Sequence, residues 1–271
     1  MLFRSGTNGI LPCGTTGESP TLSHKEHERV IEICIEASNK RIPILAGTGS
    51  NSTSEAVALT KHAAQAGADA ALLVTPYYNK PTQNGLYLHF KAVADSVDIP
   101  IILYNIAGRT AKNIEPETIA KLSSDCKNII GVKEASGSLD QMQTIKNMCH
   151  KDFLLLSGDD NLTLPVLSVG GVGVVSVVAN IVPGDVASLI KAFNDGNLKK
   201  AQEIHYDLLP LCKSMFIETN PIPVKAAMGM LGMCSEEVRL PLSPMEPKNK
   251  KKLEQALRDY GLLNSKEKAV V

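Results

Sequence analysis

The chain has 271 residues, with 28 Lys and Arg against 28 Asp and Glu, so its formal net charge is zero. That length fits one α/β barrel, and the balanced charge argues against a nucleic-acid or anionic membrane partner. No apolar run approaches the roughly 20 residues that cross a bilayer, and no signal peptide is visible, so we expect a cytoplasmic protein. The six cysteines form no CxxC pair, which argues against zinc and disulfides.

Seven short apolar runs rich in branched residues recur along the chain, and each is typical of a strand buried on both faces of a parallel sheet. Helix signals stand between several of them. Ser23 precedes Glu26 in the spacing of a capping box, and Thr53, Pro116 and Ser138 stand at or just before the starts of three further helical stretches. The predicted strands occupy residues 9–13, 42–46, 70–74, 100–104, 129–132, 153–156 and 172–178.

The predicted strands begin about 20 to 35 residues apart, the length of one βα unit, and no G-x-G-x-x-G motif follows the first of them. This repetition favours an α/β fold of the TIM type, a (β/α)8 barrel with seven strands visible in this chain. Residues 5 and 6 have the character of a helix C-cap, so we expect that an N-terminal strand and helix are missing. Residues 1–180 would then be the barrel without its first strand–helix unit. Residues 181–271 would hold the final barrel helix and a C-terminal helical extension.

Polar residues follow the predicted strands, at the ends where the active sites of such barrels form. Lys133 ends an otherwise apolar strand. If solvent surrounds it, it is an ordinary exposed lysine. If it is enclosed, desolvation lowers its pKa and leaves an amine that can form a Schiff base with a keto acid. The other strand ends carry residues 14–19, 47–49, 75–79, 104–105, 157–160 and 179–180.

Three of these strand-end features each have two interpretations. Residues 14–19, Gly-Thr-Thr-Gly-Glu-Ser, offer hydroxyl and amide groups suited to a small carboxylate, or form an ordinary strand-to-helix turn. Tyr104 is either a buried tyrosine with a satisfied hydroxyl or a phenol that passes protons to and from a carbinolamine. Arg109 is either an exposed loop residue or a guanidinium that binds the carboxylate of a second substrate.

Six segments together resemble the dihydrodipicolinate synthase family, also named 4-hydroxy-tetrahydrodipicolinate synthase. They are GTTGES at 14–19, VTPYYNKP at 74–81, LYNIAGRT at 103–110, GVKEAS at 131–136, LSGDD at 156–160 and NPIPVK at 220–225. The resemblance runs in order from about residue 6 to about residue 263. It implies condensation of pyruvate with L-aspartate 4-semialdehyde on a (β/α)8 barrel, in the lysine and diaminopimelate branch, with no metal or organic cofactor.

The resemblance also implies roles for particular residues. Lys133 forms the Schiff base with pyruvate, and Tyr104 donates and accepts the proton beside it. Thr15 and Tyr78 complete a proton relay, with Tyr78 reaching in from a neighbouring subunit of a homotetramer built as a dimer of dimers. The substrate-binding positions are Thr16 and Val175 for pyruvate, Gly158 close to them, and Arg109 for the carboxylate of the semialdehyde.

Feedback inhibition by L-lysine is a further implication of the resemblance. Glu55 is suited to pair the α-ammonium of that ligand, and histidines are suited to its carboxylate. From the residues alone, however, His24 and His27 simply form one polar face of a helix. The positions that match the family's lysine-binding cleft are Ser19, Pro20, His24, His27, Asn51, Glu55 and Tyr77.

Two other functions stay open from the residues. An aldolase of the same superfamily, such as an N-acetylneuraminate lyase, would share Lys133 and Tyr104. Arg109 and the pair Tyr77 and Tyr78 favour the synthase, because those relatives recognise polyol tails. An inactive barrel kept as an assembly subunit is favoured by the expected truncation and opposed by the complete set of chemical residues.

Overall fold

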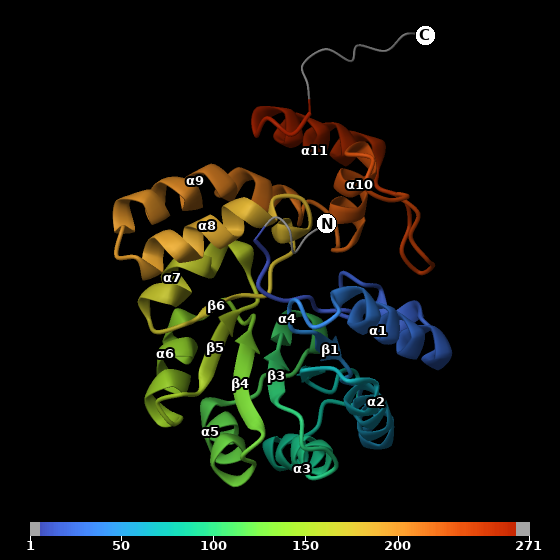
Figure 1. Cartoon of the computed structure of the whole chain (residues 1–271), viewed down its shortest axis with the longest axis vertical. Helices are drawn as coiled ribbons and strands as arrows, with labels where there is room; N and C mark the ends of the chain where they lie inside the picture. Colours follow the sequence, from blue (N-terminus) through green and yellow to red (C-terminus); the bar gives the residue numbers. More distant parts are fainter. Residues whose placement is uncertain (1–5, 264–271) are drawn as a thin grey trace.

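A single parallel sheet organises the molecule. The structure, a computed structural model, describes residues 6–263. Within that range six strands pair in chain order, every neighbour parallel, into one curled sheet (Figure 1). The predicted α/β class is therefore confirmed as a parallel half-barrel with helices. The strands are β1 (Leu45–Gly47), β2 (Ala70–Val74), β3 (Ile101–Asn105), β4 (Ile129–Glu134), β5 (Leu154–Ser157) and β6 (Gly173–Val174).

The helices lie around this sheet (Figure 1), and the local signals expected for four of them are confirmed. Ser23 and Glu26 form a reciprocal capping box. Thr53 and Pro116 are the first residues of their helices, and the Ser138 side chain caps another. The helices are α1 (His24–Ser38), α2 (Thr53–Ala66), α3 (Gln83–Ala94), α4 (Ala107–Thr110), α5 (Pro116–Asp125), α6 (Leu139–Met148), α7 (Thr163–Ser168), α8 (Pro183–Asn194), α9 (Leu198–Ser214), α10 (Ile222–Met230) and α11 (Pro247–Asp259), with 3₁₀ turns η2 (Ser19–Thr21), η3 (Asp160–Leu162) and η4 (Val178–Asn180).

The first predicted strand, residues 9–13, is wrong as a full strand. Within the described residues it forms an isolated parallel bridge between Ile10 and Ile44, and the main-chain oxygen of Pro12 accepts from Gly47 N at 3.0 Å. Pro12 has no N–H group to donate to a ladder, and Cys13 takes a left-handed φ of 56°. One bond of the ladder is therefore missing at Pro12 and the backbone turns at Cys13, so the described sheet has six strands where seven were expected.

The last predicted strand, residues 172–178, is shorter than expected. Only Gly173–Val174 pairs with β5. Further along, the main-chain N–H groups do not continue the ladder with β5. Those of Val177 and Val178 donate to Asp160 Oδ2 at 2.9 and 3.0 Å. A buried carboxylate therefore bends this segment away from the sheet, which an apolar sequence pattern could not reveal.

The register of β3 and β4 decides which side chains face the interior of the curl. Tyr104 pairs with Lys133, and Asn105 pairs with Glu134. Because side chains alternate along a strand, the first pair faces inward while the second faces the helices. The outward face is closed by a core of fully buried side chains that includes Leu103.

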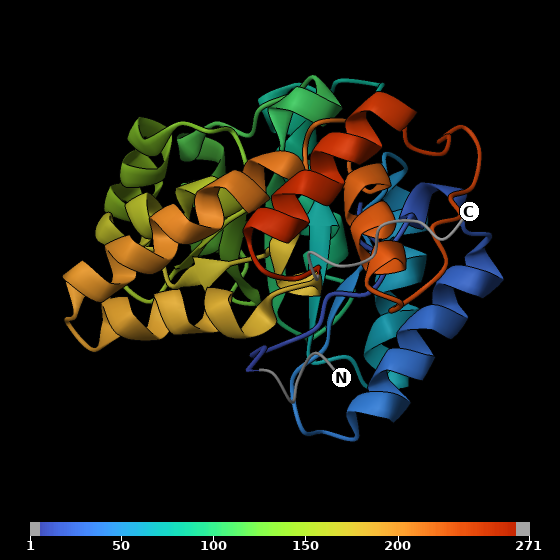
Figure 2. The same cartoon turned by 90° about the horizontal axis from the view of Figure 1, so that it is seen from above.

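The chain after Asn180 builds a second apolar core. Helices α8 to α11 pack there with η4, around buried side chains such as Val178, Leu211 and Leu253. Figure 2 shows α9, α10 and α11 passing over one end of the sheet. That end is where the loop between α9 and α10 approaches the carboxyl ends of the strands.

Candidate active site

A cavity of about 900 Å³ opens at the carboxyl ends of the strands and runs along the inner face of the curl. Seven of the eight predicted catalytic and substrate-binding residues line it. The exception is Tyr78. The seven are Thr15, Thr16, Tyr104, Arg109, Lys133, Gly158 and Val175.

Lys133 and Tyr104 lie against each other in this cavity. The Lys133 Nζ is 4.0 Å from the centroid of the Tyr104 ring. Burial lowers the pKa of Lys133 to about 8, against the partial opposition of the carboxylates of Asp159 and Asp160. Burial raises the pKa of Tyr104 to about 12, although a hydrogen bond with the Thr15 side chain opposes the shift. The interior therefore holds an amine that is easily uncharged beside a phenol that keeps its proton.

Asn220 joins two walls of the cavity and was not recognised as a site residue in the sequence. Its Nδ2 donates to the Thr16 hydroxyl at 3.0 Å, and its main-chain oxygen accepts from Arg109 Nη2 at 3.1 Å. Only 4% of Asn220 is exposed. Asn220 thus holds Thr16 and Arg109 in place, although both are far from it in the sequence. The only sequence signal was its place at the head of the NPIPVK segment.

Gly158 and Val175 lie where the ends of β5 and β6 meet. Gly158 N donates to Glu134 O at 2.7 Å, and a Cβ at Gly158 would lie 2.5 Å from the Cβ of Ala135. Glycine is therefore needed for this close approach. Val175 N donates to Ser157 O at 2.9 Å, which holds its backbone at the cavity wall.

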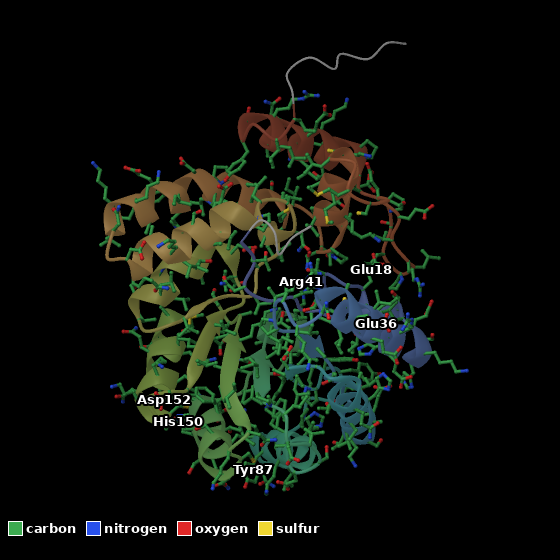
Figure 3. The ribbon with its side chains drawn as sticks, viewed as in Figure 1. Glu18, Glu36, Arg41, Tyr87, His150 and Asp152 are labelled. Carbon is green, nitrogen blue, oxygen red and sulfur yellow. The ribbon has the colours of Figure 1, made fainter. Side chains whose placement is uncertain are left out.

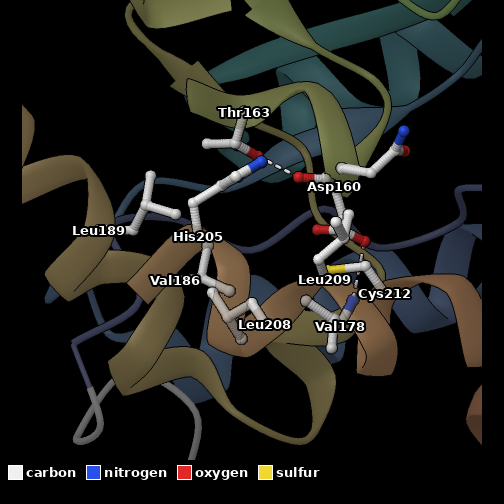
Figure 4. Close-up of a pocket in the computed structure, with 10 residues that line it drawn as sticks. Asp160, Thr163, Val178, Val186, Leu189, His205, Leu208, Leu209 and Cys212 are labelled. Atoms are coloured by element: carbon white, nitrogen blue, oxygen red, sulfur yellow. Dashed lines mark hydrogen bonds between the residues drawn. The ribbon is translucent and has the colours of Figure 1, made fainter. Parts of the chain in front are cut away.

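Asp160 anchors the loop after β6 rather than facing a substrate. Its carboxylate accepts from Val177 N and from the Ser176 hydroxyl. It also accepts from Val178 N, and its main-chain oxygen accepts from Thr163 at 2.8 Å (Figure 4). Burial raises the pKa of Asp160, and these donors oppose the shift. Both carboxylate oxygens of Asp160 therefore accept hydrogen bonds from the loop that follows β6.

A buried polar network supports the same strand ends from the helix side. Glu134 is fully buried, and its carboxylate accepts from Asn105 at 3.0 and 3.1 Å, from Ser136 N at 2.7 Å and from Gln141 at 3.0 Å. Asn105 Oδ1 also accepts from Ile114 N at 3.0 Å. The loops after β3 and β4 are thereby tied together behind Tyr104 and Lys133.

Tyr78 is the predicted relay residue that the fold leaves outside the cavity. Its side chain is 90% exposed, and its φ of 71° is rare for a tyrosine. Its neighbour Asn79 donates to the main-chain oxygen of Asn51 at 2.9 Å. Within one chain, Tyr78 therefore points to solvent.

The predicted lysine cleft is partly assembled around Glu55. His24 Nε2 lies 2.6 Å from Glu55 Oε1, and the Ser50 hydroxyl bonds the other oxygen. The Ser50 hydroxyl and His24 lower the pKa of Glu55. His27 is 5% exposed and its Nδ1 finds no partner in the described part of the chain, while burial and Glu55 raise the pKa of Tyr77. Ser19 and Pro20 lie in η2 and Asn51 in the next loop, without a described side-chain bond to Glu55.

An amine in a partly desolvated cavity at the end of a parallel half-barrel is the arrangement of an aldolase-type barrel lyase. Comparison with known proteins shows to which family within this class the chain belongs. The Dihydrodipicolinate synthetase family matches residues 1–260, and the 4-hydroxy-tetrahydrodipicolinate synthase of Endomicrobium trichonymphae is 64% identical over 96% of this chain and 89% of its own length. The chain belongs to the dihydrodipicolinate synthetase family.

Solved structures of dihydrodipicolinate synthases are similar to the structure of this chain. The dihydrodipicolinate synthase from Aquifex aeolicus is similar with a TM-score of 0.95 and 53% identity, over 96% of this chain and 89% of its own. DHDPS from Cyanidioschyzon merolae with lysine bound gives 0.95 and 43%, over 97% and 89%. A monomeric dihydrodipicolinate synthase variant gives 0.94 and 43%, over 97% and 88%.

No helix within residues 6–263 is long and apolar enough to cross a membrane. No group of three or more His, Cys, Asp or Glu side chains in that range is placed to hold a metal ion.

Proposed function

We propose that this protein condenses pyruvate with L-aspartate 4-semialdehyde to give 4-hydroxy-tetrahydrodipicolinate, the first step of the lysine and diaminopimelate branch. The observation that carries the proposal is the contact of Lys133 with Tyr104 inside the cavity, 4.0 Å from Nζ to ring centroid. An amine with a pKa near 8 is available as a nucleophile near neutral pH, whereas an ordinary lysine is almost entirely protonated.

The chemistry follows from these groups. The uncharged Lys133 amine attacks the keto carbon of pyruvate, and loss of water gives an imine. Loss of a methyl proton gives an enamine, whose carbon attacks the aldehyde carbon of the second substrate. The substrate's own α-amine then displaces Lys133 and closes the ring, so that one water is lost overall. Tyr104, hydrogen-bonded to Thr15, supplies and removes protons at the carbinolamine stage.

The substrate carboxylates are assigned to separate walls of the cavity. Thr16, Val175 and Gly158 would hold pyruvate with hydroxyl and main-chain groups, and Arg109 would hold the semialdehyde carboxylate. Arg109 is exposed at the cavity mouth and is held by Asn220 O at 3.1 Å, which leaves other guanidinium N–H groups for a ligand.

Arg109→Ala is expected to raise the KM for L-aspartate 4-semialdehyde about ten- to a hundredfold, because a charge-assisted bond to a carboxylate is lost. Imine formation with pyruvate should be nearly unchanged. Steady-state kinetics with each substrate varied in turn, together with borohydride trapping of pyruvate, measures both. An equal defect towards the two substrates would contradict the assignment and indicate structural damage.

We also propose that the active form is a homotetramer, a dimer of dimers, in which Tyr78 enters the site of a neighbouring copy. The exposed Tyr78 ring supports this proposal, because the ring is accessible to a second copy of the chain and its left-handed backbone is rare for a tyrosine. A cytoplasmic location is proposed on the six free cysteines.

Residues 1–180 are proposed to form the (β/α) barrel part of the chain, and residues 181–271 the final barrel helix and a C-terminal helical extension. The separate apolar core of α8 to α11 supports that division.

L-Lysine is proposed as an inhibitor that binds at Glu55. The His24 contact at 2.6 Å occupies Glu55 in this structure, so a ligand ammonium would replace it. Millimolar L-lysine is expected to lower the initial rate of the native protein, and His27→Ala should weaken that inhibition with kcat unchanged. His62→Ala, on the next helix, is the matched control. A native enzyme that is active but indifferent to lysine would show that these residues are structural.

The decisive experiment for the function is turnover. Pyruvate and L-aspartate 4-semialdehyde should be consumed together by the purified protein, whereas N-acetylneuraminate should not be cleaved. Cleavage of N-acetylneuraminate without condensation would favour the aldolase alternative. A folded protein that turns over neither substrate set would favour the inactive assembly subunit.

A further inference from the structure

The turn at residues 14–19 carries both threonines of the proposed site and is closed by short main-chain hydrogen bonds. Gly17 N donates to Gly14 O at 3.1 Å, and Glu18 N donates to Thr15 O at 3.1 Å. Glu18 takes a left-handed φ of 54°, a conformation that costs free energy in a residue with a side chain. Such a backbone persists only where surrounding contacts hold it, so the contacts of the Glu18 side chain decide how firmly the turn is placed.

A lysine of α10 holds the Glu18 side chain. Lys225 Nζ lies 2.9 Å from Glu18 Oε1 and also donates to the main-chain oxygen of Glu237. The exposed fraction is 12% for the Glu18 side chain and 24% for that of Lys225, so solvent screens this ion pair less than a pair on the open surface. Figure 3 shows Glu18 between α1 and the C-terminal helices. The pair thus joins the first turn to α10 across 207 positions of sequence.

The same segment holds the turn at a second point. Asn220 Nδ2 donates to the hydroxyl of Thr16, two residues before Glu18, at 3.0 Å. Lys225 N donates to Pro221 O at 3.0 Å, so Lys225 lies one helical turn beyond the Asn220 anchor. All four side chains, Thr16, Glu18, Asn220 and Lys225, line the cavity. A displacement of the turn away from α10 would therefore break both contacts.

We propose that Glu18 and Lys225 are a pair of positioning residues, whose ion pair fixes the turn so that the hydroxyls of Thr15 and Thr16 keep their places on the cavity wall. The inference rests on the proposed function and adds two residues to it that do not react. A positioning defect of about 1 Å can cost about 10²-fold in rate, so the loss of this contact should be measurable in catalysis.

Lys225→Met and Glu18→Gln each remove one charge and keep the length of the side chain. For each we expect the pyruvate concentration that half-saturates borohydride trapping to rise about tenfold and kcat to fall about tenfold. The KM for L-aspartate 4-semialdehyde should change little, because Arg109 keeps its bond to Asn220. The double variant should be no worse than the poorer single variant, since residues that act as a unit are not additive. Lys225→Arg keeps the charge and should recover most of the loss.

Lys250→Met is the matched control. It breaks the ion pair of Lys250 with Glu236, 2.5 Å long, which belongs to the same C-terminal region and does not touch the turn. Trapping and kcat should be unchanged in this variant, and the thermal unfolding midpoint of every variant is measured beside them. Equal defects in Lys250→Met would reduce the pair to general stability of the C-terminal helices and would overturn the inference.

Two further outcomes would overturn the inference alone. Losses that multiply in the double variant, or no loss in either single variant, would show that the two charges do not act together on the turn. A defective Lys225→Met beside an unaffected Glu18→Gln would show that Lys225 itself binds a substrate carboxylate. A native protein with neither pyruvate trapping nor condensation activity would overturn the proposed function and the inference together.

Discussion

Lys133→Arg is expected to lower kcat by about 10⁴-fold or more, which is the scale of loss when a covalent nucleophile is removed. The guanidinium keeps the positive charge and lacks an amine that can form an imine. Borohydride reduction with pyruvate should label the native protein on Lys133, found by peptide mapping, and leave the variant unlabelled. Lys127→Arg is the matched control, because Lys127 is exposed just before the same strand.

The rate of borohydride trapping on Lys133 is expected to depend on pH. With a pKa near 8, about half of the Lys133 amine is uncharged at pH 8, against well under one in a hundred for an ordinary lysine. Lower pH protonates the amine, so the trapping rate should rise between pH 7 and pH 9 and then level off. A rate that kept rising beyond pH 10, or an adduct on Lys225 of the cavity wall, would contradict the assignment of the nucleophile.

Tyr104→Phe is expected to lower kcat by about 10²- to 10⁴-fold, the usual contribution of a positioned proton donor. The ring contact with Lys133 should survive, because only the hydroxyl is removed. A pKa near 12 keeps that hydroxyl protonated at all working pH values, so that it serves as the donor. Tyr87→Phe, on the outer helix α3, is the control with the same chemical change.

Tyr78→Phe extends this experiment to the assembly. If Tyr78 completes the site of another copy, Tyr78→Phe and Tyr104→Phe should each be nearly inactive alone. Mixed oligomers would contain one site with both hydroxyls, so activity should return on mixing if subunits exchange. Full activity of Tyr78→Phe in a protein shown to be monomeric would refute a shared relay.

Local patterns were enough to predict how Lys133 and Tyr104 come together. Each ends an apolar run, consecutive strands of the sheet are neighbours, and the alternation along a strand turns both side chains inward. The helix start at Ser23 was likewise predicted from residues close to it in the sequence. The failures came from single residues that override a pattern: Pro12 removes a donor, and Asp160 captures the end of β6.

The rest of the site depends on contacts that the sequence order hides. Asn220 meets Thr16 across 204 positions, so no local signal marks it. The proposed role of Tyr78 requires a second copy of the chain. The cleft around Glu55 depends on a contact between α1 and α2 that no apolar pattern in the sequence predicts.

The bond between Asn220 and Thr16 also bears on how the protein is made. A ribosome delivers the first loop early, at a rate of about 5 to 20 residues per second, and must add 204 more positions before the amide that fastens Thr16 exists. The same amide's main chain holds Arg109. Every described strand precedes Asn220 in the chain, so all six can be synthesised while the pocket still lacks this bond.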